Sequence, residues 1–221
     1  AAGARSLLAA ECQRLGLSRP LVVTDAGVRQ AGVLEAALAS FGATPPPVYD
    51  GTPANPTEAA VRAAVAQYRA HGCDGLIAVG GGSAIDCAKG AAIAATHEGP
   101  LVRYATIEGG APRITADCAP IVALPTTAGT GSEVARGAIV IVDDGRKLGF
   151  HSWHILPKLA ILDPQLTLGL PSGLTAVTGI VGPQRFPSPA ETWAALAQLW
   201  DPGYAGGRLP QQVYHSLRLV L

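Results

Sequence analysis

The sequence lacks the features of a membrane, secreted or nucleic-acid-binding protein. No stretch approaches the roughly 20 consecutive apolar residues of a membrane-spanning helix, and the first residues have no secretion signal. The 16 Lys and Arg residues balance 16 Asp and Glu residues, so no excess positive charge exists to hold nucleic acid or an anionic membrane. We therefore expect a cytoplasmic protein whose partner is a small molecule, with no nucleic acid and no membrane involved.

Cysteine is also scarce, and its pattern excludes a disulfide framework. The four cysteines are scattered without any C-x-x-C spacing. A chain of 221 residues that is 48% hydrophobic is long enough to bury a core without such bonds. We expect reduced thiols.

Short apolar runs with the length of buried strands recur along the chain. They lie at residues 21–24, 76–79, 121–124, 138–142 and 159–162. Helical patterns lie between them, at residues 28–41 and 83–95 and in the stretch before residue 72. Because parallel strands need crossovers, this alternation predicts an α/β fold with a mostly parallel, Rossmann-like sheet and helices on both faces.

The helix before the second of these strands has the clearest end signals. Asn55 is placed to cap it, Pro56 fits the first helical position, and Glu58 lies three residues after the cap as a capping-box partner. Gly72 fits a C-terminal glycine. One buried face is predicted by the spacing of Val61, Ala64, Val65 and Tyr68.

The pattern changes beyond residue 171, where glycines and prolines interrupt the chain repeatedly. We place a domain boundary between Leu166 and Pro171. Residues 1–168 then form the α/β domain, and residues 169–221 form part of an α-helical domain with short helices at 191–200 and 211–221.

A glycine turn, Gly80 to Ser83, joins a predicted strand to a predicted helix. Pyrophosphate binds where backbone N–H groups converge at a helix start, and glycines let its oxygens approach. In the common Rossmann fingerprint this turn follows the first strand, with an acidic residue about 20 positions later. Here the order is reversed, because Asp25 ends the first strand and the glycines come 55 positions afterwards. A plain tight turn, with Ser83 as cap and Asp86 completing a capping box, explains the same residues.

A second loop, Pro125 to Val134, is dense in hydroxyls and glycines directly after a predicted strand. It can offer hydroxyl and amide donors to phosphate and ribose without adding a charge. It also fits a Thr-rich turn that caps a helix starting near Ser132.

Together, the two segments resemble the signature stretches of the iron-containing (group III) alcohol dehydrogenases. The first reads GGGSAID at residues 80–86, and the second reads PTTAGTGSEV at residues 125–134, about 45 positions later. The likeness extends through residues 21–25, 163–167 and 174–179, so it covers most of residues 1–179.

The resemblance implies an NAD(P)-dependent oxidoreductase that moves a hydride between nicotinamide and a small alcohol or aldehyde, in a family that is commonly homo-oligomeric. Residues 1–168 would then be a dinucleotide-binding domain, and its two loops would line one cleft. The implied cofactor-binding residues are Asp25, Gly80, Gly81, Gly82, Ser83, Asp86, Thr126, Thr127, Thr130, Ser132 and Lys147. Lys147 also fits a solvated lysine at a strand end.

Asp25 bears on the choice of cofactor. By the resemblance it would face the adenosine ribose, where a carboxylate accepts hydrogen bonds from a 2′-hydroxyl but repels a 2′-phosphate. NAD is therefore expected rather than NADP.

The family's metal site is not visible in this sequence. In the family, the segment equivalent to residues 175–179 runs into a helix with an aspartate and, four residues later, a histidine that ligate Fe²⁺ or Zn²⁺. Residues 180–185 read IVGPQR and contain neither ligand. His151 and His154 lie in a predicted strand or loop, and His215 stands alone. We predict no metal ligand and no catalytic residue from these positions.

Several explanations for the missing ligands stay open. Residues could be omitted after Gly179 and before Ala1, which we favour; the chain could be truncated; or it could belong to a branch without the metal helix. A maleylacetate reductase shares the glycine turn and works without metal, but its Pro-Thr-Thr loop usually departs from the sequence at residues 128–130. A nucleotide-binding module without turnover also remains open.

Overall fold

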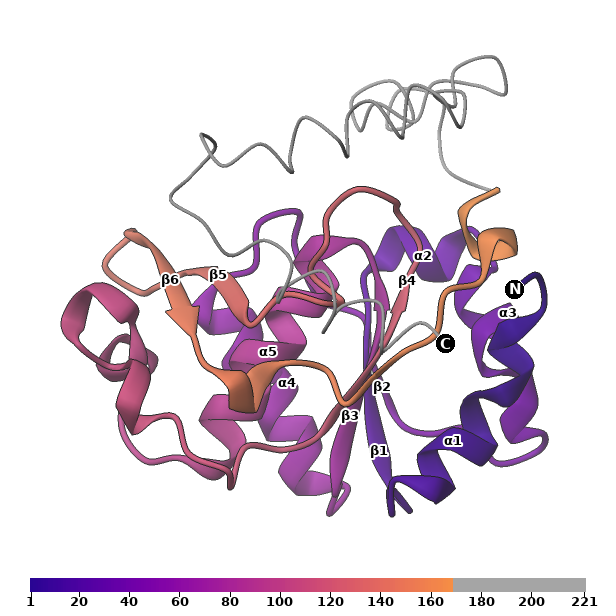
Figure 1. Cartoon of the computed structure of the whole chain (residues 1–221), viewed down its shortest axis with the longest axis horizontal. Coiled ribbons are helices and arrows are strands. Elements are labelled where there is room, and N and C mark those ends of the chain that lie inside the picture. Colours follow the sequence, from indigo (N-terminus) through magenta and orange to yellow (C-terminus); the bar gives the residue numbers. More distant parts are fainter. Residues whose placement is uncertain (169–221) are drawn as a thin grey trace, which may run out of the picture. The chain divides into compact units, whose positions relative to one another are not determined.

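A five-stranded parallel sheet forms the centre of the computed structural model, which describes residues 1–168 (Figure 1). Its strand order is β2-β1-β3-β4-β7, and every neighbouring pair is parallel. The strands are β1 (Pro20–Val23), β2 (Val48–Tyr49), β3 (Gly75–Gly80), β4 (Ile121–Pro125) and β7 (Leu159–Ala160). The predicted Rossmann-like α/β architecture is confirmed.

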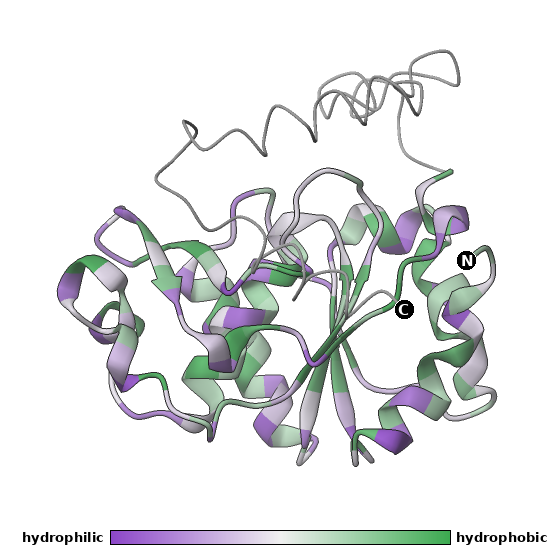
Figure 2. Cartoon of the chain, in the orientation of Figure 1, coloured by the Kyte–Doolittle hydropathy of each residue, from purple (hydrophilic) through white to green (hydrophobic). Residues whose placement is uncertain are grey.

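Side chains of the central strands alternate between two hydrophobic clusters, one on each face of the sheet. Val22 and Ile77 belong to the cluster with α1 (Leu8–Arg14) and α3 (Val33–Leu38). Leu76 belongs to the cluster that includes α4 (Glu58–Ala70) and α5 (Gly82–Thr96). Helices therefore cover both faces, which explains why the strands read as continuous apolar runs (Figures 1 and 2).

The apolar run at residues 138–142 forms a strand outside this sheet. β5 (Gly137–Ile141) pairs antiparallel with β6 (Lys147–His151), which the sequence patterns did not indicate. Val140 and Phe150 are buried, whereas Ile139 is exposed. One face of the hairpin is thus buried against the α/β core, as expected of an antiparallel ribbon.

The helix predicted at residues 28–41 is wrong in its extent. The chain forms α2 (Ala26–Gln30), α3 and a 3₁₀ turn (Ala39–Phe41) instead. Gly32 separates α2 from α3 with a φ of 70°, a left-handed conformation that ends the first helix and redirects the chain.

The start of α4 also differs from the prediction. Thr57, not Asn55, caps the helix by accepting a hydrogen bond from the Ala60 amide, and no capping box with Glu58 forms. The end of α4 matches the prediction, since Gly72 adopts a φ of 58° after the last turn.

The described residues also form several other short 3₁₀ turns. They span Ala4–Leu7, Leu101–Tyr104, Thr106–Glu108, Ala111–Arg113, Trp153–Ile155 and Pro164–Thr167. The helical domain predicted for residues 169–221 lies outside the described residues. Among the helices of residues 1–168, none combines the length and the apolar character needed to cross a membrane.

Candidate functional site

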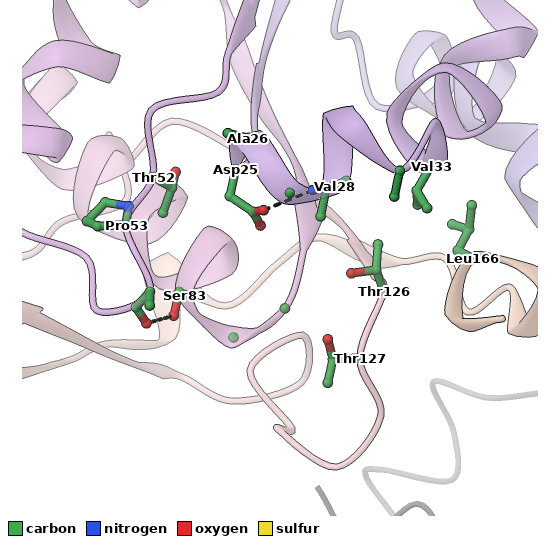
Figure 3. Close-up of a pocket in the computed structure, with 15 residues that line it drawn as sticks. Asp25, Ala26, Val28, Val33, Thr52, Pro53, Ser83, Thr126, Thr127 and Leu166 are labelled. Atoms are coloured by element: carbon green, nitrogen blue, oxygen red, sulfur yellow. Dashed lines mark hydrogen bonds between the residues drawn. The ribbon is translucent and has the colours of Figure 1, made fainter. Parts of the chain in front are cut away.

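The order of the strands creates a crevice at one end of the sheet. From β1 the chain leaves toward β2 on one side and returns to β3 on the other, so the carboxyl ends of β1 and β3 flank a topological switch point. Ligands of open α/β sheets bind at such points. A cavity of about 550 Å³ lies there, lined by residues that follow β1, β2, β3 and β4 (Figure 3).

The glycine turn forms the floor of this cavity. A Cβ added at Gly80, whose φ is 153°, would lie 2.6 Å from the Cβ of Ala84, so a larger residue does not fit. Gly81 is the N-cap of α5 and no side chain caps the helix, while Gly81, Gly82 and Ser83 all line the cavity. The uncapped amides at this helix start can therefore hold an anion.

The capping box of Ser83 and Asp86, which was the alternative explanation for this turn, does not form. Gly81, not Ser83, is the N-cap of α5, and the Oγ of Ser83 donates a hydrogen bond to the carbonyl oxygen of Ala54 (Figure 3). The Oδ2 atom of Asp86 accepts a hydrogen bond of 3.0 Å from the amide of Ile139 in β5. Asp86 thus connects α5 to the hairpin, and it is absent from the residues that line the cavity.

The Thr-rich loop contacts the glycine turn directly. The amide of Thr126 donates to the carbonyl of Gly80 at 3.0 Å. A Cβ added at Gly81 would lie 3.1 Å from Oγ1 of Thr127, and one added at Gly82 would lie 3.3 Å from Cβ of Thr130. The prediction that both loops border one cleft is confirmed.

The members of this loop have different positions in the site. Thr126 and Thr127 line the cavity, whereas Thr130 and Ser132 lie against Gly82 without lining it. The alternative of a helix that starts near Ser132 is not observed, because residues 132–134 form a turn. A segment this short before β5 leaves no room for a helix.

Asp25 lies at the carboxyl end of β1 and faces the cavity (Figure 3). Its Oδ1 atom caps α2 by accepting from the amide of Val28 at 2.9 Å. Its Oδ2 atom would be 3.4 Å from a Cβ added at Gly80, so the carboxylate borders the glycine turn. The cavity therefore has an acidic group beside the uncapped amides of the glycine turn.

Lys147 lies at the start of β6, where its Nζ atom donates to Oδ1 of Asn55 at 3.0 Å. Asn55 directly follows Ala54, which lines the cavity. The predicted lysine is thus near the cavity but does not line it.

Three features of the site gave no signal in the sequence. Thr52, from the segment after the two-residue β2, lines the cavity with a buried Oγ1 that has no hydrogen-bond partner among the described residues. Val33 and Leu166 add apolar surface to the wall (Figure 3). A glycine cradle and an apolar wall are together suited to a nucleotide.

Lys89 is a further residue that the sequence analysis missed. Its side chain is fully buried, and Nζ donates to the carbonyl oxygens of Ser132, Ala135 and Gly137, each at 2.7 Å. Burial lowers the pKa of Lys89 to about 8, against the opposing effects of Asp86 and Glu133. Burial raises the pKa of Asp86, and the Ile139 amide and the Lys89 ammonium partly offset this.

The described residues do not assemble a metal site. Within residues 1–168, no three His, Cys, Asp or Glu side chains gather closely enough to hold a metal ion. His151 instead contacts Thr106, with 2.9 Å between Nδ1 and Oγ1.

The chain matches known proteins over the same region that forms this site. The model of the family described as iron-containing alcohol dehydrogenase matches residues 1–164. A 4-hydroxybutyrate dehydrogenase of Cupriavidus necator is 67% identical over 178 residues, which are 80% of this chain and 47% of that protein. The chain spans about half the length of the curated relatives that it matches.

Two solved structures are similar in both fold and sequence. A 1,3-propanediol oxidoreductase has a TM-score of 0.75 and 41% identity, over 81% of this chain and 47% of that one. The sulfoacetaldehyde reductase of Bifidobacterium kashiwanohense, solved with NAD⁺, has a TM-score of 0.75 and 30% identity, also over 81% of this chain and 47% of that one.

Proposed function

The chain belongs to the iron-containing alcohol dehydrogenase family, and we propose that its α/β unit binds NAD(H) for an oxidoreductase. The whole protein would transfer a hydride between nicotinamide and a small alcohol or aldehyde. The observation that carries this proposal is the direct contact between the glycine turn and the Thr-rich loop beside one cavity.

The cavity residues divide between the chemical parts of a dinucleotide. The first amides of α5, at Gly81 to Ser83, would hold the diphosphate, and the hydroxyls of Thr126 and Thr127 would donate to it or to the ribose. The apolar wall at Val33 and Leu166 suits a base. The other predicted residues would support the cofactor site from positions around the cavity; they are Lys147, Asp86, Thr130 and Ser132.

Asp25 supports NAD as the cofactor. A carboxylate in the wall can accept hydrogen bonds from both hydroxyls of a ribose, but it repels the charge of a 2′-phosphate. We therefore expect NAD to bind more tightly than NADP.

The bound nicotinamide would supply the hydride chemistry, and the chain would supply its position. The family's metal does not fit the described residues, because they offer no group of ligands for it. The relative at 67% identity makes 4-hydroxybutyrate the first substrate to test.

A cytoplasmic location and a homo-oligomeric state also belong to this proposal. The four cysteines are free, which agrees with a reducing compartment.

Calorimetry of the full chain with NAD⁺, NADH and NADPH tests the proposal. NADH formation would be followed in parallel with 4-hydroxybutyrate and 1,3-propanediol, with and without added Fe²⁺ or Zn²⁺. Binding of NAD⁺ and NADH is the expected result, and turnover that requires added metal would indicate metal ligands outside the described residues. Turnover of maleylacetate after chelation would favour the metal-independent reductase, and binding without turnover under every condition would favour a nucleotide-binding module. Absence of binding would refute the proposal.

A further inference from the structure

Lys89 is the only Lys or Arg with a buried side chain in the described part of the chain. Its ammonium has three N–H donors, and the three carbonyl acceptors, of Ser132, Ala135 and Gly137, all lie at 2.7 Å. All three acceptors are backbone atoms of residues 132–137, which run from the last part of the Thr-rich loop to the first residue of β5. We call residues 132–137 the anchored segment.

The anchored segment reaches the glycine turn. Ser132 is its first residue, and its Oγ would lie 3.2 Å from a Cβ added at Gly82. Thr130, two residues earlier, packs on the same glycine. A shift of the anchored segment would therefore move the wall that supports the start of α5.

The neighbouring charges explain how a buried ammonium is tolerated. A buried charge is costly unless it is paired and hydrogen-bonded. Asp86 on α5 and Glu133 in the anchored segment are the acidic groups that act on Lys89. Asp86 lies one helical turn before Lys89 and binds the amide of Ile139, just beyond the anchored segment. The same stretch of α5 thus holds the segment and the first residues of β5.

We propose that Lys89 is a positioning residue for the cofactor, which it serves by fixing the anchored segment against the glycine turn. This inference rests on the proposed NAD(H) binding. Lys89 does not line the cavity, so it would act through Thr130, Ser132 and Gly82 rather than by touching the nucleotide.

The first arm of the test measures NADH affinity of the full chain. Lys89→Met keeps an unbranched apolar stem but leaves three buried carbonyls unpaired, so the NADH dissociation constant should rise about tenfold or more. Lys158→Met is the matched control, because Lys158 is exposed. The NADH dissociation constant of this control should stay within about twofold of the wild-type value.

The second arm uses trypsin cleavage to measure local opening of the anchored segment. The exposed Arg136 lies between Ala135 and Gly137, so two of the carbonyls that Lys89 binds flank the Arg136–Gly137 bond. Cleavage there requires the anchored segment to open, and Lys89→Met should speed it about tenfold. Cleavage after the exposed Arg113 serves as the internal reference and should not change.

The outcomes separate positioning from a general structural role. If Lys89→Met is folded, and both NADH affinity and Arg136 cleavage equal those of wild type, the inference is overturned. A lower melting temperature without those two changes overturns it as well. If the Met variant fails to fold, Lys89→Gln, which keeps two N–H donors, should show smaller changes in the same directions. A wild-type chain that does not bind NADH would refute the proposed function instead, while Arg136 cleavage would still decide whether Lys89 holds the segment.

Discussion

Asp25 caps α2, and in the proposed function the same carboxylate also recognises the ribose. One oxygen caps α2 through the Val28 amide, and the other borders Gly80 at the cavity. A substitution that tests recognition must therefore keep the cap. Asn and Asp cap helices about equally well, so their exchange isolates the charge.

Asp25→Asn should narrow the preference for NAD over NADP. Removing the negative charge removes its repulsion of a 2′-phosphate, and the ratio of the two dissociation constants should change by about tenfold. Calorimetry with both cofactors measures the ratio, and Asp144→Asn, in the β5–β6 turn, is the control. Asp25→Gly should act in the same direction. An unchanged ratio in both variants would remove Asp25 from the ribose site.

Gly81→Val should abolish NADH binding and leave the chain folded. The added Cβ would lie 3.1 Å from Oγ1 of Thr127, and the methyl groups would extend into the space where a diphosphate would approach the amides. Ala63→Val, on the exposed side of α4, controls for the added volume. Circular dichroism reports the fold and calorimetry the binding, and normal affinity in the folded variant would contradict the assigned turn.

At the level of elements, α4 is connected to its surroundings by a buried acid at its first turn. The Glu58 carboxylate accepts hydrogen bonds from the amides of Leu101, at 3.1 Å, and Asp143, at 3.0 Å. Glu58 thus joins α4 to the 3₁₀ turn at Leu101 and to the β5–β6 turn. Both donors lose their partner if the carboxylate is removed.

Glu58→Ala should lower the free energy of unfolding by about 2 kcal/mol, because it removes the acceptor of two backbone amides. Glu58→Gln keeps one acceptor oxygen and should cost less. Glu35, an exposed acid in the first turn of α3, provides the matched control, and its change to Ala should cost about 0.5 kcal/mol or less. Urea denaturation measures all three, and equal losses at positions 58 and 35 would contradict the role of Glu58.

At the scale of the whole described unit, residues 1–168, Asp163 joins the first residues of the chain to the last described ones. Its carboxylate accepts from the amides of Gly3 and Arg5, each at 3.1 Å, and pairs with the Arg5 guanidinium at 2.9 Å. Burial alone would raise the pKa of Asp163, but the hydrogen bonds from Arg5, Gln165 and Gly3 lower it below the ordinary value of 3.8. The ionised form is therefore favoured in the folded state.

Asp163→Asn should destabilise the unit more at neutral pH than in acid. Because the folded-state pKa lies below the unfolded value, the stabilisation by Asp163 is present above about pH 4 and is lost as the pH falls further. The difference in unfolding free energy between wild type and variant should thus shrink from about pH 6 to about pH 3. Urea titrations at several pH values check this, and a constant difference would show that ionisation of Asp163 is not involved.

The sequence by itself determined the α/β class, the main strands and the two loops that border the cavity. These features are local, because buried parallel strands read as apolar runs and tight turns require glycine within a few residues. Gly80 to Gly82 and the loop from Thr126 were therefore identifiable, as was the helix end at Gly72.

Tertiary structure alone decided the partners of residues that are distant in sequence. Glu58 and Lys89 looked like ordinary helix residues, but each binds backbone groups about 40 or more positions away. Thr52 and Leu166 line the cavity because packing brings their segments to the switch point. A periodic pattern records which face of an element is buried, but the identity of the group on the other side depends on how the elements fold together.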